Sequence, residues 1–471
     1  MENTGFGIAI MAAGKGTRLK SRRPKVLHEI GGQALLLHVI AAAKTVTPAA
    51  KIYCIIGHEA ESVRAAVEST GVAFVLQAEQ RGTGHALQQL KAHFAASHET
   101  PPENLLVLSG DVPLIKPATL EAMCAFHLRE HAAMTILTAE PTDPTGYGRV
   151  LRVSETSAEV TAIVEQKSLR PKQLIAREIN SGIYCFRTAT LFAHLDSLST
   201  NNAHGEFYLT DIAAMLVAEG ERVVALKADS VDEVLGANTI AEMMYLDAAM
   251  RLATAQRLMS EGVTIFRPET CVIDAQVEVG PDTVIEPYVQ LLRNTKVGCD
   301  CRIASYSVVE NTTLGNNVLL RNGCIVSEST IADGAKLGPY AHLRPGSDIG
   351  EGAHIGNFVE TKKIRMGKGS KANHLSYLGD AVIGSGVNIG AGTITCNYDG
   401  TYKHPTTIDD GVFVGSNSTL VAPLTLGDGA YIAAGSCITE DVPAEALALG
   451  RSRQTTKLGW ASARKSAKSN G

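Results

Sequence analysis

Aliphatic residues recur at every sixth position over the last third of the chain. Two series carry the repeat: Ile331, Leu337, Leu343, Ile349 and Ile355, then Val414, Leu420, Leu426, Ile432 and Ile438. A repeat this short cannot bury its apolar face alone, so successive repeats must stack on one another as a solenoid. Period six predicts a β-helix of hexapeptide repeats, with the aliphatic side chains inside a triangular prism. Strands of an ordinary sandwich would instead show period two, with turns at irregular spacing.

Small residues accompany the repeat, and we expect them to let the chain turn the corners of the prism. They include Gly350, Gly356, Gly384, Gly390, Gly415 and Gly427. The register slips twice, because Ile355 to Ile383 is 28 residues and Ile389 to Val414 is 25 residues, neither a multiple of six. We expect loops to leave the prism at these two places, as functional excursions from a rigid scaffold. Polar and aromatic residues stand in them: His374, Tyr377, Asn397, Tyr398 and Lys403.

Before the repeat, short apolar runs alternate with helical patterns, which is typical of an α/β domain with a mainly parallel sheet. The predicted strands are 7–13, 51–56, 105–108, 134–139 and 183–186. Residues 239–262 contain no Pro and place Met243, Leu246 and Met250 on one side, which predicts a single linker helix. The expected domains are therefore an α/β domain over 1–238, the helix over 239–262, the β-helix over 263–448 and a tail over 449–471.

Composition limits the possible classes of protein. A chain of 471 residues is too long for one core, and its net charge of -5 gives no footprint for nucleic acid, so we expect no nucleic-acid partner. The nine cysteines are scattered, and Cys299 and Cys301 are too close for a metal-binding pair, so we expect neither a disulfide framework nor a zinc site. No apolar run approaches transmembrane length, and the run from Ile8 to Ala13 is too short for a signal peptide. A cytoplasmic protein without a membrane partner fits these features.

A Gly-rich loop, Gly14-Lys15-Gly16-Thr17-Arg18-Leu19, follows the first predicted strand, and Pro24-Lys25 comes soon after. Glycines let backbone N–H groups approach phosphate oxygens, and the carboxyl end of a strand is where open α/β sheets bind ligands. The loop is not a Walker A motif, because Gly16 stands where Ser or Thr is needed. It is not a dinucleotide fingerprint either, because Leu19 stands where Gly or Ala is needed.

Met11-Ala-Ala-Gly-Lys-Gly-Thr-Arg18 with Pro24-Lys25 resembles the sugar-nucleotide pyrophosphorylases. Further matches follow in order: Gln77-Ala-Glu-Gln-Arg-Gly-Thr83-Gly-His, Gly110-Asp111-Val-Pro-Leu, Thr145-Gly-Tyr-Gly148-Arg, Ile163-Val-Glu165, Ile179-Asn180 and Asn238. Together with the hexapeptide repeats, the chain resembles the bifunctional N-acetylglucosamine-1-phosphate uridyltransferase / glucosamine-1-phosphate acetyltransferase family. The implied fold class is α/β, with an N-terminal Rossmann-like nucleotidyltransferase domain, a long linker helix and a C-terminal left-handed parallel β-helix.

In the uridyltransferase reaction an anionic sugar phosphate attacks the α-phosphorus of UTP, so positioning and charge neutralisation matter more than a general base. Arg18 and Lys25 are placed to supply fixed positive charge, and Asp111 is a good ligand for Mg²⁺. The resemblance implies that Asp111 and Asn238 hold the metal. It also implies a set of nucleotide- and sugar-binding residues: Met11, Ala12, Ala13, Gly14, Lys25, Gln77, Gly82, Thr83, Ser109, Gly110, Asp111, Gly148, Glu165, Asn180 and Asn238. The chain departs from the family in having Ser109 in place of Tyr and Thr239 in place of a second Asn.

Attack of a glucosamine amine on a thioester needs a base with a near-neutral pKa, and His374 suits this role. The resemblance implies that His374 is the catalytic base, with Glu360 and Asn397 able to orient it, and that Lys403 reaches a neighbouring chain. The implied acceptor-binding residues are Arg344, Lys362, Tyr377 and Asn388. The implied acetyl-CoA-binding residues are Ala391, Asn397, Tyr398, Ser416, Ala434 and Arg451.

The full interpretation is a cytoplasmic homotrimer that acetylates glucosamine 1-phosphate with acetyl-CoA, then transfers UMP from UTP with Mg²⁺. One alternative is a monofunctional nucleotidylyltransferase whose β-helix is structural. A second is an acetyltransferase whose nucleotide domain only binds. The basic tail, with Arg451 and the only Trp, Trp460, is either frayed or a ligand-binding arm.

Overall fold

The computed structural model describes residues 5–202 and 205–469. The chain forms two compact units, Met1–Arg251 and Leu252–Gly471, and the division falls within helix α7 (Ile240–Ser260). Each unit has its own hydrophobic core. Among the described residues, every helix is too short or too polar to cross a membrane.

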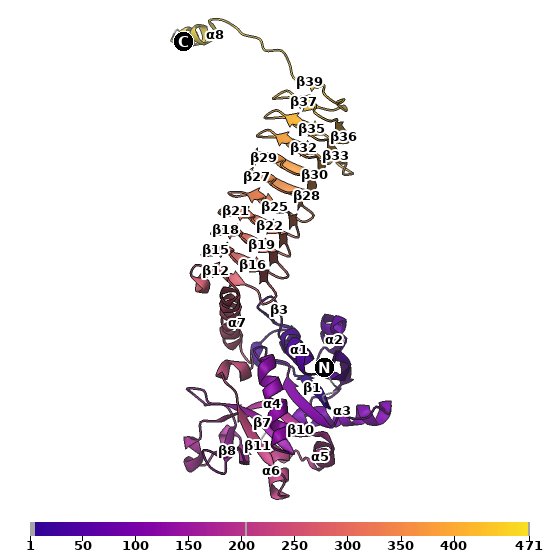
Figure 1. Ribbon diagram of the computed structural model, residues 1–471, viewed down its shortest axis with the longest axis vertical. Helices are drawn as coiled ribbons and strands as arrows, with labels where there is room; N and C mark the ends of the chain where they lie inside the picture. The colour runs from indigo at the N-terminus through magenta and orange to yellow at the C-terminus, as the bar shows by residue number, and fades with distance from the viewer. Residues whose placement is uncertain (1–4, 203–204, 470–471) are drawn as a thin grey trace. The chain divides into compact units, whose positions relative to one another are not determined.

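The N-terminal unit is built on a mixed sheet with strand order β11-β7-β10-β6-β1-β4-β5 (Figure 1). All five strands expected from the apolar runs are in it: β1 (Phe6–Ala12), β4 (Ile52–Ile56), β6 (Asn104–Ser109), β7 (Met134–Ala139) and β10 (Ile179–Arg187). The edge strands are β5 (Ala73–Leu76) and β11 (Val223–Lys227), and β8 (Arg149–Arg152) and β9 (Val160–Val164) form a side hairpin. Along the strand order given above, every pairing is parallel except those of β10, which runs antiparallel to β6 and β7. The side hairpin is antiparallel as well.

Successive residues of a strand point to opposite faces of the sheet, so these apolar strands place side chains on both faces. Helices cover both faces and bury those side chains. In β1, Ile8 and Ile10 belong to one core and Ala9 belongs to the other. The first core is covered by α1 (Leu35–Val46), α2 (Ala60–Val67) and α4 (Pro117–Arg129). The second is covered by α3 (Thr83–Ser97), α5 (Thr188–His194) and α6 (Asp211–Ala218). This is the α/β class that the sequence predicted.

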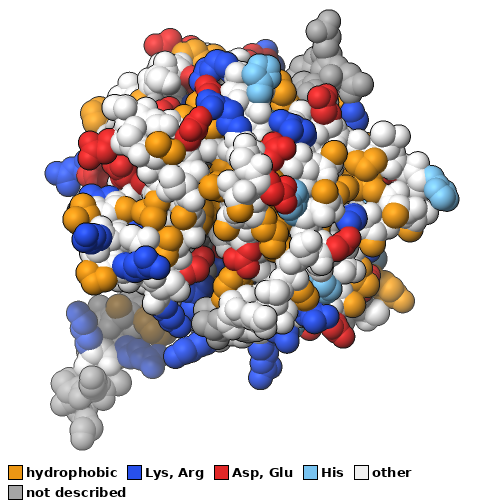
Figure 2. Space-filling model, turned by 90° about the horizontal axis from the view of Figure 1, so that it is seen from below, with side chains coloured by type: hydrophobic (Ala, Val, Ile, Leu, Met, Phe, Trp, Pro, Cys, Tyr) orange, Lys and Arg blue, Asp and Glu red, His pale blue; other side chains and the backbone are white. Residues whose placement is uncertain are grey.

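Figure 2 shows Lys and Arg side chains interspersed with Asp and Glu over the upper part of the drawn face, with Lys and Arg more frequent along its lower edge. Such mixing is expected of a chain with 43 basic and 48 acidic residues.

The helix expected over 239–262 is observed as α7, Ile240–Ser260. The three residues predicted to share one side, Met243, Leu246 and Met250, are all buried. The tail contains a further helix, α8 (Trp460–Ser469), which the sequence pattern did not predict.

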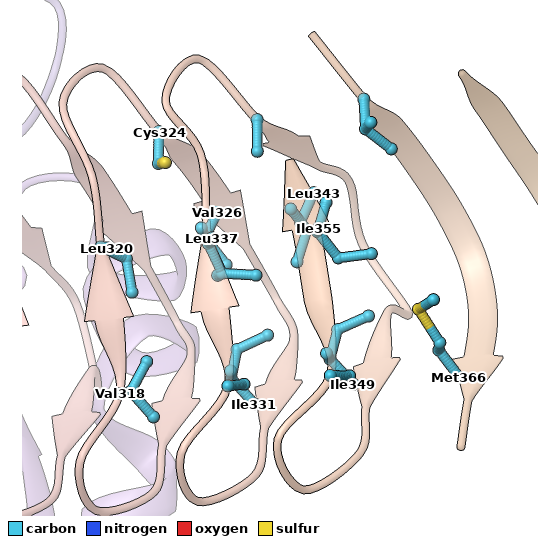
Figure 3. Close-up of a cluster of buried hydrophobic side chains, with 14 of the residues drawn as sticks. Val318, Leu320, Cys324, Val326, Ile331, Leu337, Leu343, Ile349, Ile355 and Met366 are labelled. Atoms are coloured by element: carbon cyan, nitrogen blue, oxygen red, sulfur yellow. The ribbon is translucent and has the colours of Figure 1, made fainter. Parts of the chain in front are cut away.

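The C-terminal unit is a parallel β-helix, in which short strands from β12 (Thr264–Ile265) to β39 (Leu447–Ala448) stack coil upon coil (Figure 1). The repeat residues point into the prism in separate columns (Figure 3). Leu337 lies between Leu320 and Ile355 in one column, and Ile331 pairs with Ile349 in another. All ten residues of the two sequence series are buried, so the hexapeptide prediction is confirmed.

The repeat glycines have a different role from the expected one. Gly356 and Gly415 do not adopt a left-handed conformation, and a Cβ on either would lie only 2.0 Å or 2.4 Å from the backbone of the next coil. Their function is to allow close approach of adjacent coils. Left-handed turn positions fall instead at residues such as Gly352 and Gly386, with φ of 64° and 67°.

The first expected loop is wrong, because residues 356–383 stay within the coils. Strands β28 (Glu360–Met366) and β30 (Tyr377–Ile383) each run seven residues through a corner and pair with one another. In each of these strands, two side chains that point into the prism are five residues apart instead of six: Thr361 and Met366 in β28, and Leu378 and Ile383 in β30. The sequence period therefore slips without a loop. The second loop is confirmed, because Tyr398 and Lys403 pair antiparallel as a small hairpin between two coils.

Leu337 tests how far the stacked core stabilises the C-terminal unit. Leu337→Ala should lower the free energy of unfolding of that unit by about 2–5 kcal/mol, because it removes buried methyl groups and leaves a cavity. Denaturant titration of the full chain, following the C-terminal transition, measures this value. Lys336→Ala, which changes the exposed neighbour on the same strand, should have little effect. Equal losses in the two variants would contradict a core role for Leu337.

Candidate functional sites

The Gly-rich loop and Asp111 lie at one edge of the N-terminal sheet because their strands are neighbours. Strands β1 and β6 are parallel and pair Met11 with Ser109, so the segments that follow both strands leave at the same edge. A pocket of about 430 Å³ opens there. Ten of the predicted nucleotide- and sugar-binding residues line it: Met11, Ala12, Ala13, Gly14, Lys25, Gln77, Gly82, Thr83, Ser109 and Asp111. Gly110 lies against the floor, where a Cβ would be 3.1 Å from the carbonyl oxygen of Met11.

Gly16 brings Lys25 to the pocket. Its φ of 60° is left-handed, and a Cβ at this position would lie 2.6 Å from Cβ of Lys25. Any side chain at position 16 would therefore push Lys25 away from the loop. Gly236 packs closely against Asp111: a Cβ added to this glycine would lie 3.2 Å from Oδ2 of the carboxylate.

Lys25 connects the two predicted metal ligands. Its ammonium forms an ion pair with Oδ2 of Asp111 and donates a hydrogen bond of 2.9 Å to Oδ1 of Asn238. Arg18 donates to the same Asn238 oxygen at 2.7 Å. Burial alone raises the pKa of the Asp111 carboxyl, but the Lys25 ammonium and the Ser109 hydroxyl more than offset this and hold the pKa below its usual value. The carboxylate is therefore charged at neutral pH.

The donor set fits a Mg²⁺ ion that arrives with phosphate. The oxygens of Asp111 and Asn238 converge on one cationic atom, Nζ of Lys25, and hard divalent cations prefer such oxygen ligands. In the described part of the chain there is no group of three or more His, Cys, Asp or Glu side chains that could hold a metal. With only one carboxylate and one amide from the protein, phosphate oxygens and water must complete the shell of a bound Mg²⁺.

The three predicted sugar-contacting residues lie together. The N–H of Asn180 donates to the carbonyl of Gly148 at 2.9 Å, and the ideal Cβ position of Gly148 is 3.5 Å from Oε1 of Glu165. The Asn180 amide donates to the hydroxyl of Tyr184 at 2.9 Å, which fixes the orientation of its carboxamide. Tyr184 is buried and was not expected at the site.

Five other residues on the nucleotide pocket were also missed: Lys15, Val26, Gln80, Ala86 and Glu206. Gln80 stands within the motif that begins at Gln77, so its position in the sequence offered a signal. Glu206 is far from the motifs in sequence, and it reaches the pocket because the carbonyl of Phe207 accepts the N–H of Gly84 at 2.8 Å. Only the tertiary structure shows this contact.

In the C-terminal unit, His374 ends strand β29 (Lys371–His374), and it is exposed. Above it, successive coils place three of the predicted acetyl-CoA residues in one column: Ala391, Ser416 and Ala434. Backbone hydrogen bonds show this order. The residue after Ala391 donates its N–H to the carbonyl of His374 at 3.3 Å, the residue after Ser416 donates to Ala391 at 2.7 Å, and the residue after Ala434 donates to Ser416 at 2.8 Å. Arg451 continues the column by donating to the carbonyl of Ala434 at 2.8 Å.

A cluster of charges occupies the neighbouring sheet. Arg344 pairs with Glu360 at 2.9 Å, so Glu360 is engaged away from His374. Contact with Lys403, followed by the charge of Arg344, lowers the pKa of Lys362. These cations gather within one chain, which makes the cluster suited to an anionic group. Lys403 does not need a neighbouring chain to reach Lys362.

The remaining predicted residues are divided between the sheets. Asn397 donates to Asp380, and its amide lies 2.9 Å from the ideal Cβ position of Gly379, beside the Tyr377 hydroxyl. Tyr398 is exposed on the hairpin. Asn388, on β31 (Asn388–Ile389), pairs with Lys371 in the other sheet, so one chain does not place it among Arg344, Lys362 and Tyr377.

Two family comparisons match different parts of the chain. Residues 8–181 match the MobA-like NTP transferase domain. Residues 328–363 match the bacterial transferase hexapeptide family, with six repeats. The first match covers the nucleotide pocket, and the second lies in the β-helix.

Curated relatives match nearly the whole chain. A bifunctional protein GlmU from Koribacter versatilis is 62% identical over 460 residues, covering 98% of this chain and 97% of the relative. Proteins of the same name from Solibacter usitatus and Streptococcus agalactiae are 49% and 44% identical, each covering at least 96% of both chains.

Proposed function

The chain belongs to the bifunctional GlmU family, and we propose that its C-terminal unit acetylates glucosamine 1-phosphate and its N-terminal unit then transfers UMP from UTP to the product. The relatives carry a bifunctional name and the chain has both transferase domains, which favours this function over a monofunctional nucleotidylyltransferase with a structural β-helix. The observation that carries the proposal is that Lys25, at the nucleotide pocket, joins Asp111 by an ion pair and Asn238 by a hydrogen bond.

In the uridylyl transfer, a phosphate oxygen of N-acetylglucosamine 1-phosphate attacks the α-phosphorus of UTP. A new P–O bond forms, and the bond to pyrophosphate breaks with its electron pair leaving on pyrophosphate. Arg18 and Lys25 hold the phosphates in line by charge, while Gly148, Glu165 and Asn180 orient the sugar. When bound at Asp111 and Asn238, Mg²⁺ supplies further neutralisation of phosphate charge.

In the acetyl transfer, the glucosamine nitrogen attacks the thioester carbon of acetyl-CoA. His374 accepts the amine proton as the C–N bond forms, and the CoA thiolate leaves. Arg344 and Lys362, with Lys403 beside them, bind the phosphate of the acceptor, and Tyr377 contacts its sugar. Asn388 lies on the other sheet, so it contacts this sugar from a neighbouring chain of the assembly. The column of Ala391, Ser416, Ala434 and Arg451 receives acetyl-CoA, together with Asn397 and Tyr398.

Assembly as a cytoplasmic homotrimer completes the proposal. UTP and acetyl-CoA as co-substrates support the cytoplasmic location. An exposed apolar column on one corner of the β-helix supports association, since large exposed patches mark interaction surfaces. Its residues are Tyr288, Tyr306, Tyr340, Phe358 and Leu375, and the rings stack in pairs with centroids 5.2 and 5.7 Å apart. All five occupy left-handed positions, which are costly for bulky side chains.

Asp111→Asn tests the uridylyl site. The variant should lose Mg²⁺-dependent pyrophosphate release and keep acetyl transfer, because it removes a metal-ligand charge from one unit only. Both half-reactions are measured on one preparation. Asp196→Asn changes an exposed carboxylate that also pairs with a lysine, and it should leave both reactions intact. Normal uridylyl transfer by Asp111→Asn would remove this residue from the metal site.

His374→Ala tests the acetyl site. Acetylation should fall by roughly 10²–10⁴, as expected for the loss of a general base, while uridylyl transfer from supplied N-acetylglucosamine 1-phosphate continues. Rates are measured with labelled acetyl-CoA over a range of pH. A variant with the wild-type rate and pH profile would show that His374 is not the base.

Light scattering tests the assembly. The full chain should have about three times the chain mass of 49.8 kDa. Phe358→Asp should lower this mass, because it places a charge on the apolar column at a left-handed position that Asp tolerates. Tyr402→Asp, at an exposed site outside the column, is the matched control. A monomeric wild-type chain would contradict the homotrimer.

A further inference from the structure

His85 lies between two carboxamides beside the nucleotide pocket. It stands on the first turn of α3, directly after Thr83 and Gly84. Its Nδ1 is 3.2 Å from Nε2 of Gln77, and its Nε2 is 3.1 Å from Nε2 of Gln89. Gln77 lines the pocket and is almost completely buried, whereas Gln89 is on the far side of the imidazole ring, one turn along the helix.

The protons of this network can be assigned from its partners. Nε2 of Gln77 also lies 3.1 Å from the carbonyl oxygen of Gly82, which can only accept, so this end of the carboxamide is the amino group. One of its hydrogens goes to Gly82 and the other goes to His85. Nδ1 of a neutral His85 is therefore the acceptor, and Nε2 carries the proton. That proton needs an acceptor, whereas the structure places Nε2 of Gln89 toward the ring. We therefore assign the Gln89 carboxamide in the reverse orientation, with its oxygen accepting from Nε2 of His85.

This arrangement uses both hydrogens of Gln77 inside the protein. Its carboxamide oxygen has no hydrogen-bond partner within the described ranges 5–202 and 205–469, so the group offers only an acceptor to the pocket. A nucleobase that places an N–H at this edge is attracted, and one that places a lone pair there is repelled. Uracil carries a hydrogen on N3, whereas cytosine carries a lone pair on the same atom.

We propose that His85 is a positioning residue for base selection: it fixes Gln77 with its oxygen toward the nucleotide and so favours a uracil base over cytosine. This inference rests on the proposed uridylyl transfer. His85 acts through Gln77 and does not itself line the pocket.

The ring of His85 is held in place from the other side. Phe207 stacks on it with centroids 6.3 Å apart and planes inclined by 26°, and the guanidinium of Arg81 lies 5.0 Å above the Phe207 ring. This packing, together with the two carboxamide contacts, favours the ring orientation that keeps the acceptor beside Gln77.

The test compares kcat/KM for UTP and CTP in four variants of the full chain. His85→Phe keeps a stacked ring but removes both nitrogens, which leaves one hydrogen of Gln77 without a partner and frees the carboxamide to turn. The UTP/CTP ratio should fall about tenfold, the cost of one hydrogen bond near the upper end of its usual range, through a higher KM for UTP with kcat little changed. His85→Asn, whose side-chain oxygen can replace Nδ1, should restore most of the ratio.

Gln89→Leu and His93→Phe complete the set. Gln89→Leu removes the acceptor for the Nε2 proton on the side away from the pocket, so it should lower the UTP/CTP ratio less than His85→Phe. This variant gives an independent reading if His85→Phe does not fold. His93→Phe removes a histidine from the same helix, where the ring contacts Tyr53 at 6.0 Å instead of Gln77, and it should leave the ratio unchanged.

The outcomes separate the inference from the function on which it rests. A wild-type chain that does not turn over UTP overturns the proposed uridylyl transfer. A wild-type chain that prefers UTP, together with folded His85→Phe and Gln89→Leu variants that keep the same preference, overturns the role of His85 alone.

Discussion

Parallel strand pairing is the constraint on which both functional sites depend. In the N-terminal unit it aligns Met11 with Ser109, so the Gly-rich loop and Asp111 leave the sheet at the same edge. In the β-helix the same kind of pairing stacks Ala391, Ser416 and Ala434 above His374. Parallel strands present like ends together, so residues far apart in sequence meet at one edge or in one column.

Close backbone approach is the second requirement, and glycine meets it in both units. Gly16 allows Lys25 to pack against the phosphate loop, and Gly356 allows the next coil of the β-helix to pass. A Cβ would collide in both cases, so these positions tolerate no side chain without local displacement. In both units, predicted site residues therefore stand beside backbone that passes at close range.

The two sites differ in how their charges are arranged. In the nucleotide pocket, the ammonium of Lys25 balances the charge of Asp111. The ion pair offsets the desolvation cost of the half-buried carboxylate, which therefore stays ionised. In the β-helix, Lys362, Lys403 and Arg344 lie together on an exposed surface, and mutual repulsion lowers the pKa of Lys362. Glu360 pairs with Arg344 and the charge of Asp380 raises the pKa of Lys362, so carboxylates offset part of this repulsion.

The sequence alone determined the β-helix, the α/β unit and most of the nucleotide pocket, because period-six burial and strand-loop motifs are local patterns. It did not reveal why the first register slip occurs, since a strand that bends through a corner and a loop that leaves the prism give the same spacing. Tertiary structure also decided which residues meet from distant segments: Glu206 reaches the pocket through Phe207, and Tyr184 orients Asn180. It separated Asn388 from Tyr377, because successive strands of one coil belong to different faces of the prism. Such contacts depend on three-dimensional packing, which spacing along the chain does not encode.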